Sequence, residues 1–154
     1  MIGNGQNSKK GNKLVAVYGT LRKSFENHHF VEKAKYLGTF TSKSRFIMIC
    51  IGPYPILTPE TSLSEAQIKD LSSKNINATN IVYELYELNK DHWKNVCHLE
   101  GFTGQRGNRK NEYETMDLET DHGIAEIFVQ HKLAEGEFVS NGDYLVFKAK
   151  SLKL

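Results

Sequence analysis

The run of apolar residues from Phe46 to Ile51 places the strongest constraint on the fold. Six apolar side chains follow one another there (Phe46-Ile47-Met48-Ile49-Cys50-Ile51), whereas a strand with one face in water alternates apolar and polar residues. A continuous run of this kind is typical of a strand that is covered on both faces. The chain is therefore expected to build a β-sheet with packed material on each side of this strand.

The remaining pattern predicts many strands and few helices. A helix is expected over Lys90–Leu99, capped by Asn89 or Asp91 and ended by Gly101. A polar excursion at about 60 to 80 contains a second helical stretch, Ser64–Leu71, capped by Ser62 or Ser64. Further strands are expected over Leu14–Tyr18, Tyr36–Ser42, Ser44–Ile51, Asn80–Leu88, Tyr113–Leu118, Gly123–His131 and Tyr144–Lys148, with an extended path at Ile56–Thr58 and a short helical turn at Phe30–Ala34. This content favours a mostly β or α+β domain, a small barrel among the candidates.

Composition limits the classes of function. With 154 residues, 39% of them hydrophobic, the chain is expected to form one domain over 13–154 behind a flexible N-terminal tail, 1–12. A net charge of +2 gives no general attraction to nucleic acid or to a membrane surface, and neither is expected as a partner. No apolar stretch approaches the ~18 residues of a membrane span. Cys50 and Cys97 are interpreted as reduced thiols of a cytoplasmic protein. The oligomeric state stays open.

The first strand ends in a loop that could hold an anion. Leu14–Val17 is apolar, and Tyr18-Gly19-Thr20-Leu21-Arg22 follows it. Backbone N–H groups left unpaired at the end of a strand can bind a carboxylate or phosphate, and glycine lets the backbone come close to it. An ordinary turn is the alternative that these residues alone leave open.

Glu100 is the candidate acid/base. It stands at the end of the expected helix, between Leu99 and Gly101-Phe102. A helix C-terminus and apolar neighbours both disfavour the ionised carboxyl and raise its pKa towards neutrality, where one group can accept and return a proton. A solvated glutamate in the last turn of a helix is the alternative.

Other chemistries lack their motifs. The six histidines show no metal-binding spacing, so no metal site is expected. No G-x-S-x-G elbow occurs, and His98 is too close in sequence to Cys97 to face it from one helix. The glycine-rich segment 101–107 follows a helix instead of opening one, which excludes a dinucleotide loop.

In their order along the chain, these motifs resemble the γ-glutamylcyclotransferase superfamily, in particular its AIG2-like and γ-glutamylamine cyclotransferase branch. The matching segments are Tyr18–Arg22, Asn27-His28, Tyr54-Pro55, Val82–Leu88, Leu99–Phe102, Tyr113 and Ser140–Tyr144. The resemblance implies a small mixed β-barrel with flanking short helices, an α+β fold. It also implies an enzyme without a cofactor that cyclises a γ-glutamyl amine or peptide to 5-oxoproline.

The resemblance also implies roles for individual residues. Glu100 would be the general acid/base, and the N–H groups near Gly19, Thr20 and Leu21 would hold the substrate's α-carboxylate. Hydroxyl contacts would come from Tyr18 and Tyr113, and a further contact to the carboxylate from Arg22.

The sequence departs from the family pattern at three positions. Val96 and Cys97 stand where Leu-Asp is common, and Thr115 stands where an arginine is common. These departures favour one alternative, a catalytically silent protein that binds a small anion on the same fold. A second alternative is a protein-interaction module that uses the charged 104–112 loop and the 60–80 excursion.

Overall fold

The computed structural model describes residues 11–23 and 25–151 of the chain. The expected tail, 1–12, lies outside the described residues except for Gly11 and Asn12. The amide of Asn12 donates a hydrogen bond to the Glu87 carboxylate at 2.8 Å. Within the described part, no helix is long and apolar enough to cross a membrane.

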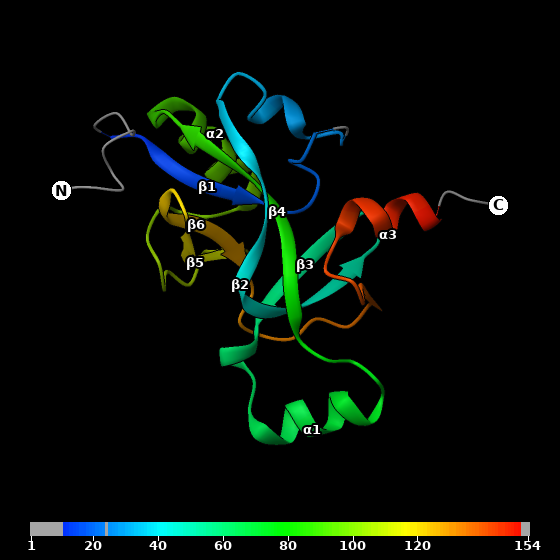
Figure 1. The fold of residues 1–154 in the computed structure, drawn as a ribbon. Helices are drawn as coiled ribbons and strands as arrows, with labels where there is room; N and C mark the ends of the chain where they lie inside the picture. Colours follow the sequence, from blue (N-terminus) through cyan, green and yellow to red (C-terminus); the bar gives the residue numbers. More distant parts are fainter. Residues whose placement is uncertain (1–10, 24, 152–154) are drawn as a thin grey trace.

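A single mixed sheet organises the molecule (Figure 1). Its strands follow the order β3-β2-β4-β1-β6-β5, and β7 pairs with β2 away from this path. All neighbours are antiparallel except β1 and β6, which run parallel. The strands are β1 Lys13–Val17, β2 Lys35–Ile51, β3 Tyr54–Pro59, β4 Thr79–Leu88, β5 Glu114–Thr120, β6 Gly123–Val129 and β7 Glu137–Phe138.

The sheet curls until its distant strands approach one another. Just after β6, the N–H of Gln130 donates to the carbonyl of Leu57 in β3 at 2.9 Å. Ala16, Leu57 and Ile127 belong to one buried cluster inside the curl. Together with the helices, this curled sheet confirms the α+β, barrel-like fold expected from the sequence.

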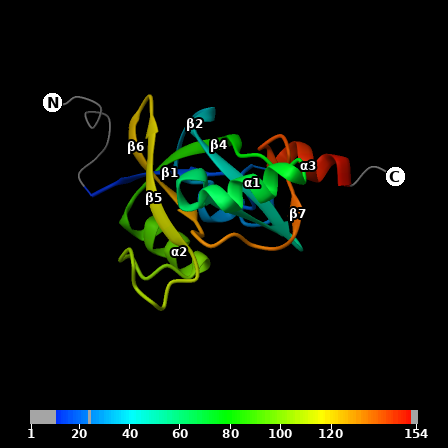
Figure 2. The same cartoon turned by 90° about the horizontal axis from the view of Figure 1, so that it is seen from below.

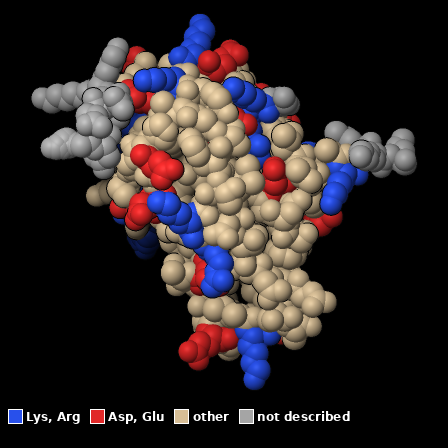
Figure 3. Space-filling view, viewed as in Figure 1, with Lys and Arg blue, Asp and Glu red and all other residues tan. Residues whose placement is uncertain are grey.

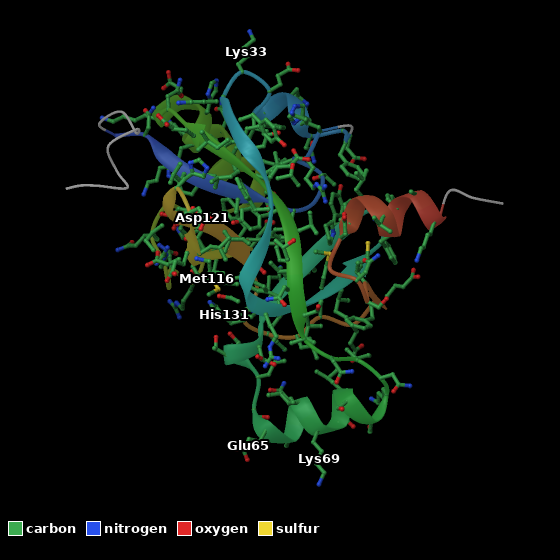
Figure 4. All side chains as sticks on the ribbon, in the orientation of Figure 1. Lys33, Glu65, Lys69, Met116, Asp121 and His131 are labelled. Atoms are coloured by element: carbon green, nitrogen blue, oxygen red, sulfur yellow. The ribbon has the colours of Figure 1, made fainter. Side chains whose placement is uncertain are left out.

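The run that begins at Phe46 is covered on both faces as far as Cys50, as predicted, whereas Ile51 at its end is exposed. Phe46, Met48 and Cys50 face the interior cluster. Ile47 and Ile49 pack on the opposite face against Leu71 of α1, Glu65–Ser73. The excursion at 60–80 thus covers the second face of β2. Its helix α1 lies below the sheet in Figure 1 and in front of it in Figure 2. Glu65 and Lys69 point from α1 away from the sheet (Figure 4).

Local capping signals fixed two helices. Ser64 and Gln67 form a reciprocal capping box at the start of α1. The Asn89 side chain accepts from the N–H of His92 at the start of α2, Lys90–Glu100. Gly101 ends α2 with a φ of 65°, a left-handed conformation that favours glycine. Both helices lie within two residues of their predicted bounds.

Two predictions of secondary structure were wrong. Tyr144–Ser151 is the helix α3 and not a strand, because the Asp143 carboxylate accepts from the N–H groups of Leu145 and Val146 and starts the helix. The two strands expected on either side of Lys43 are one strand, β2. Its pairing with β4 shifts between Thr41 and Arg45, so the polar stretch is an irregularity within a strand and not a break.

Candidate active site

A cavity of about 340 Å³ opens where β1 ends. Its walls come from segments that are far apart in sequence and that the curl of the sheet brings together. They are residues 16–21, Asn27, Tyr54, Pro55, Leu99, Glu100, Glu112, Tyr113 and Phe128. The expected anion loop and the expected acid/base therefore line the same cavity.

The loop after β1 presents unused hydrogen-bond donors. Among the described residues, none accepts a hydrogen bond from the N–H groups of Gly19, Thr20 or Leu21. The loop is nevertheless held in place: the N–H of Arg22 donates to the Gly19 carbonyl, and that of Asn27 to the Thr20 carbonyl, both at 3.0 Å. Fixed, unpaired N–H groups are the elements of an anion site.

Glu100 reaches the cavity from the last residue of α2. Burial raises the pKa of its carboxyl from the ordinary value of 4.5 to about 7, and the negative charge of Glu112 adds to the shift. Glu112 is close because its side chain lies over Gly101, where a Cβ would come within 2.8 Å of it. A carboxyl with this pKa can accept and return a proton at neutral pH.

The two candidate tyrosines lie in the cavity wall with different hydroxyl environments. The hydroxyl of buried Tyr18 donates to the Phe128 carbonyl at 2.6 Å, so that its proton is already engaged. The Tyr113 hydroxyl has a longer contact of 3.5 Å with the Pro55 carbonyl. Burial, and then the charge of Glu100, raises the pKa of Tyr113 well above its usual range. Of the two, Tyr113 has the freer hydroxyl.

Arg22 lies outside the cavity lining. Its buried guanidinium binds the Glu84 carboxylate at 3.1 Å and the Asp143 carboxylate at 2.9 Å. Glu84 also accepts from the N–H of Lys23 and from the Tyr86 hydroxyl. The arginine therefore fastens the loop to β4, and we expect no direct contact with a substrate.

Comparison with known proteins identifies the family. The sequence pattern of the family described as "Gamma-glutamyl cyclotransferase, AIG2-like" matches residues 15–146. The chain belongs to this family.

Individual relatives agree with that assignment. A Vibrio cholerae protein named "Putative gamma-glutamylcyclotransferase" is 40% identical over 42 residues, which are 27% of this chain and 36% of that protein's length. The structure is similar to that of PH0828 from Pyrococcus horikoshii (TM-score 0.66, 19% identity, 90% of this chain and 95% of that one). It is also similar to an AIG2-like protein of Mus musculus (TM-score 0.55, 14% identity, 80% of each chain). These two likenesses concern the fold.

The departures from the γ-glutamyl cyclotransferase pattern have local structural roles. Val96 and Cys97 are buried on the face of α2 that packs against β1. Burial raises the pKa of the Cys97 thiol to about 11, so that it stays neutral. The hydroxyl of Thr115 accepts a hydrogen bond from the Nε of Arg106 at 3.0 Å. The guanidinium of Arg106 therefore lies beside position 115, where an arginine is common in the family pattern.

Among the lining residues to which the sequence assigned no role, three are important for the site: Asn27, Pro55 and Glu112. The Asn27 amide donates to the Thr20 hydroxyl at 2.9 Å and stabilises the anion loop. Pro55 packs against Gly19, and Glu112 contributes a second carboxylate. Asn27 and Pro55 stood in motifs that resemble the family, but nothing local marked Glu112. Among the described residues, no group of His, Cys, Asp or Glu could hold a metal ion.

Gly19 is expected to tolerate no side chain. A Cβ at this position would lie 2.5 Å from Cγ of Pro55 and 3.2 Å from its Cδ. We expect Gly19→Ala to move the loop, to destabilise the protein by about 1–3 kcal/mol in urea unfolding, and to weaken anion binding. In a Pro55→Ala background the same change should cost clearly less. If Gly19→Ala lowers the stability equally in both backgrounds, the contact with Pro55 is not what requires glycine at position 19.

Proposed function

We propose that this protein is a γ-glutamyl cyclotransferase that converts a γ-glutamyl amine or peptide to 5-oxoproline and releases the amine. One observation carries the proposal. A carboxyl with a pKa of about 7 and three backbone N–H groups without an acceptor among the described residues line one cavity of about 340 Å³. The first can move a proton at neutral pH, and the second can hold a carboxylate.

The roles follow from the chemistry of ring closure. The substrate's α-carboxylate binds to the N–H groups of Gly19, Thr20 and Leu21. Its α-amine, once neutral, attacks the γ-carbonyl carbon, so that one C–N bond forms and the C–N bond to the leaving amine breaks. Glu100 accepts the proton that the attacking nitrogen loses and donates it to the departing nitrogen, so protons balance over one turnover. The nucleophile belongs to the substrate, so no serine or cysteine is required.

Positioning supplies a second part of the rate enhancement. The attacking amine and the carbonyl already belong to one molecule, and a fixed α-carboxylate restricts the chain to conformations near ring closure. Well-oriented intramolecular reactions gain several kcal/mol in this way. Tyr113 is the side chain we assign to the carbonyl oxygen, because its hydroxyl has only the 3.5 Å contact with Pro55. Independence from cofactors and a cytoplasmic location stay predictions from the sequence.

The direct test is the release of 5-oxoproline. Purified protein is incubated with γ-glutamyl amides, and product is quantified by chromatography. Release of 5-oxoproline that requires the folded protein supports the proposal. Binding of 5-oxoproline without any release would favour the silent anion-binding protein instead. Neither binding nor release would favour the interaction module.

The pH dependence gives an independent prediction. Glu100 must be ionised to act as the base, so kcat/KM is expected to rise with pH through about 7, the raised pKa of its carboxyl. This rise is the acidic limb of the pH profile. Because the charge of Glu112 contributes to the raised pKa of Glu100, Glu112→Gln should move the acidic limb to lower pH. A limb near 4.5, the ordinary value, would contradict the assignment of Glu100.

A further inference from the structure

The charged side chains that line the cavity have one sign. They are Glu100 and Glu112, and no lysine, arginine or histidine of the described part of the chain lines the cavity. The chain as a whole carries a net charge of +2. On the face drawn in Figure 3, basic and acidic side chains are interspersed. The negative character of the cavity is thus a local property and not a consequence of composition.

The backbone of Glu112 is fixed beside the catalytic candidate. Its N–H donates to the Gly101 carbonyl at 2.8 Å, and its carbonyl accepts from the Gln130 amide at 3.3 Å. Its side chain lies over Gly101, as the 2.8 Å approach to a Cβ at that position shows. The backbone of Glu112 is therefore held beside the end of α2, from which Glu100 reaches the cavity.

The Glu112 carboxylate has no cation as a partner among the described residues. Of the cations in the same loop, Arg106 binds Asp117 and Glu126, and Arg109 and Lys110 form no ion pair with a described carboxylate. An exposed carboxylate at the wall of a cavity, with no counter-ion among the residues that the structure describes, is available to a charge on a ligand.

The reaction determines which part of a substrate meets this charge. The α-carboxylate is held at the loop 19–21, and the leaving nitrogen must lie beside Glu100 to be protonated. The group attached to that nitrogen then occupies the part of the cavity beside Glu100, whose wall also contains Glu112. A positive charge on this group is attracted by Glu112, and a carboxylate there is repelled.

We propose that Glu112 selects the leaving group by charge: the preferred substrates are γ-glutamyl amides whose released amine carries a second, positively charged amino group, and those that release an amine with a carboxylate are disfavoured. This inference rests on the proposed cyclotransferase activity and adds a specificity-determining residue to it.

A series of matched substrates tests the inference. The γ-glutamyl amides of 1,2-diaminoethane, propylamine and β-alanine have similar length and carry a positive, no and a negative charge on the leaving group. Wild-type kcat/KM is expected to fall in that order. In Glu112→Gln the ratio of the first to the last should drop about tenfold, the factor that roughly 1.4 kcal/mol produces. A general change in Glu100 basicity would alter all three substrates alike and leave the ratio unchanged.

The control is Glu119→Gln, which removes the same charge from a side chain that is 72% exposed and lies outside the cavity lining. Its ratio should equal that of the wild type. Should Glu112→Gln fail to fold, the wild-type ratio is measured at about 0.05 and 0.5 M salt, where screening should reduce it. Activity with an unchanged ratio overturns the role of Glu112 and leaves the cyclotransferase proposal standing. The absence of 5-oxoproline from all three substrates overturns the proposed function itself.

Discussion

Glu100→Gln is expected to lower kcat/KM for 5-oxoproline release between about 10² and 10⁴-fold, the range that general acid/base catalysis contributes. Glutamine keeps the size of the side chain and its place at the end of α2, but it cannot accept a proton. Some activity over the uncatalysed reaction should remain, because the N–H groups of the loop still position the substrate. Binding of 5-oxoproline, measured by calorimetry, should change little.

The stability of the same variant separates loss of chemistry from loss of folding. In the folded protein the pKa of Glu100 is raised to about 7 from an ordinary 4.5. Its contribution to stability is therefore present below the lower value and is lost as the pH rises through the higher one. Above pH 7 the buried, ionised carboxylate lowers the stability of the folded protein, and neutral glutamine does not. We expect the unfolding midpoint of Glu100→Gln at pH 8 to equal or exceed that of the wild type. A Glu100→Gln variant whose kcat/KM stays close to that of the wild type would refute the role of Glu100, whatever its stability.

Features with a local cause were predictable from the sequence. Ser64 and Asn89 are side-chain caps, and Gly101 provides a left-handed residue at a helix end. Each acts within a few residues of its own position, so the pattern that produces it can be seen directly. The continuous run from Phe46 likewise required cover on both faces, although the sequence did not indicate that Leu71 would supply part of it.

Features that depend on distant partners were not predictable from local patterns. The helix Tyr144–Ser151 is a mixed case: its hydrogen bond from the Tyr144 hydroxyl to the Pro53 carbonyl is long-range, but its cap, Asp143, is local and was missed in a run that looks like a strand. Arg22 follows the anion loop and was assigned to it, but its partners are Glu84 and Asp143, far along the chain. The family resemblance, and not periodicity, linked Glu100 to this loop.

Arg22→Met is expected to destabilise the protein by about 3–5 kcal/mol, because it leaves the Glu84 carboxylate buried without its cation. Both side chains of this pair are nearly inaccessible, at 4% and 6% exposure. Urea unfolding monitored by Trp93 fluorescence measures the change. The loop 19–23 depends on this anchor, so the variant should also bind 5-oxoproline more weakly under conditions where it is still folded.

Two comparisons test whether burial of the Arg22–Glu84 pair causes the expected loss of stability. Arg45→Met breaks a pair with Glu60 of similar length, 3.0 Å, but with 58% and 31% of the side chains exposed. It should cost at most about 1 kcal/mol, as exposed pairs do. Adding Glu84→Gln to Arg22→Met removes the uncompensated charge and should recover part of the lost stability, since the amide can still accept from the N–H of Lys23. Two results would show that the Arg22–Glu84 pair does not fasten the anion loop to β4. One is an equal loss of stability in Arg22→Met and Arg45→Met, and the other is a further loss of stability when Glu84→Gln is added to Arg22→Met.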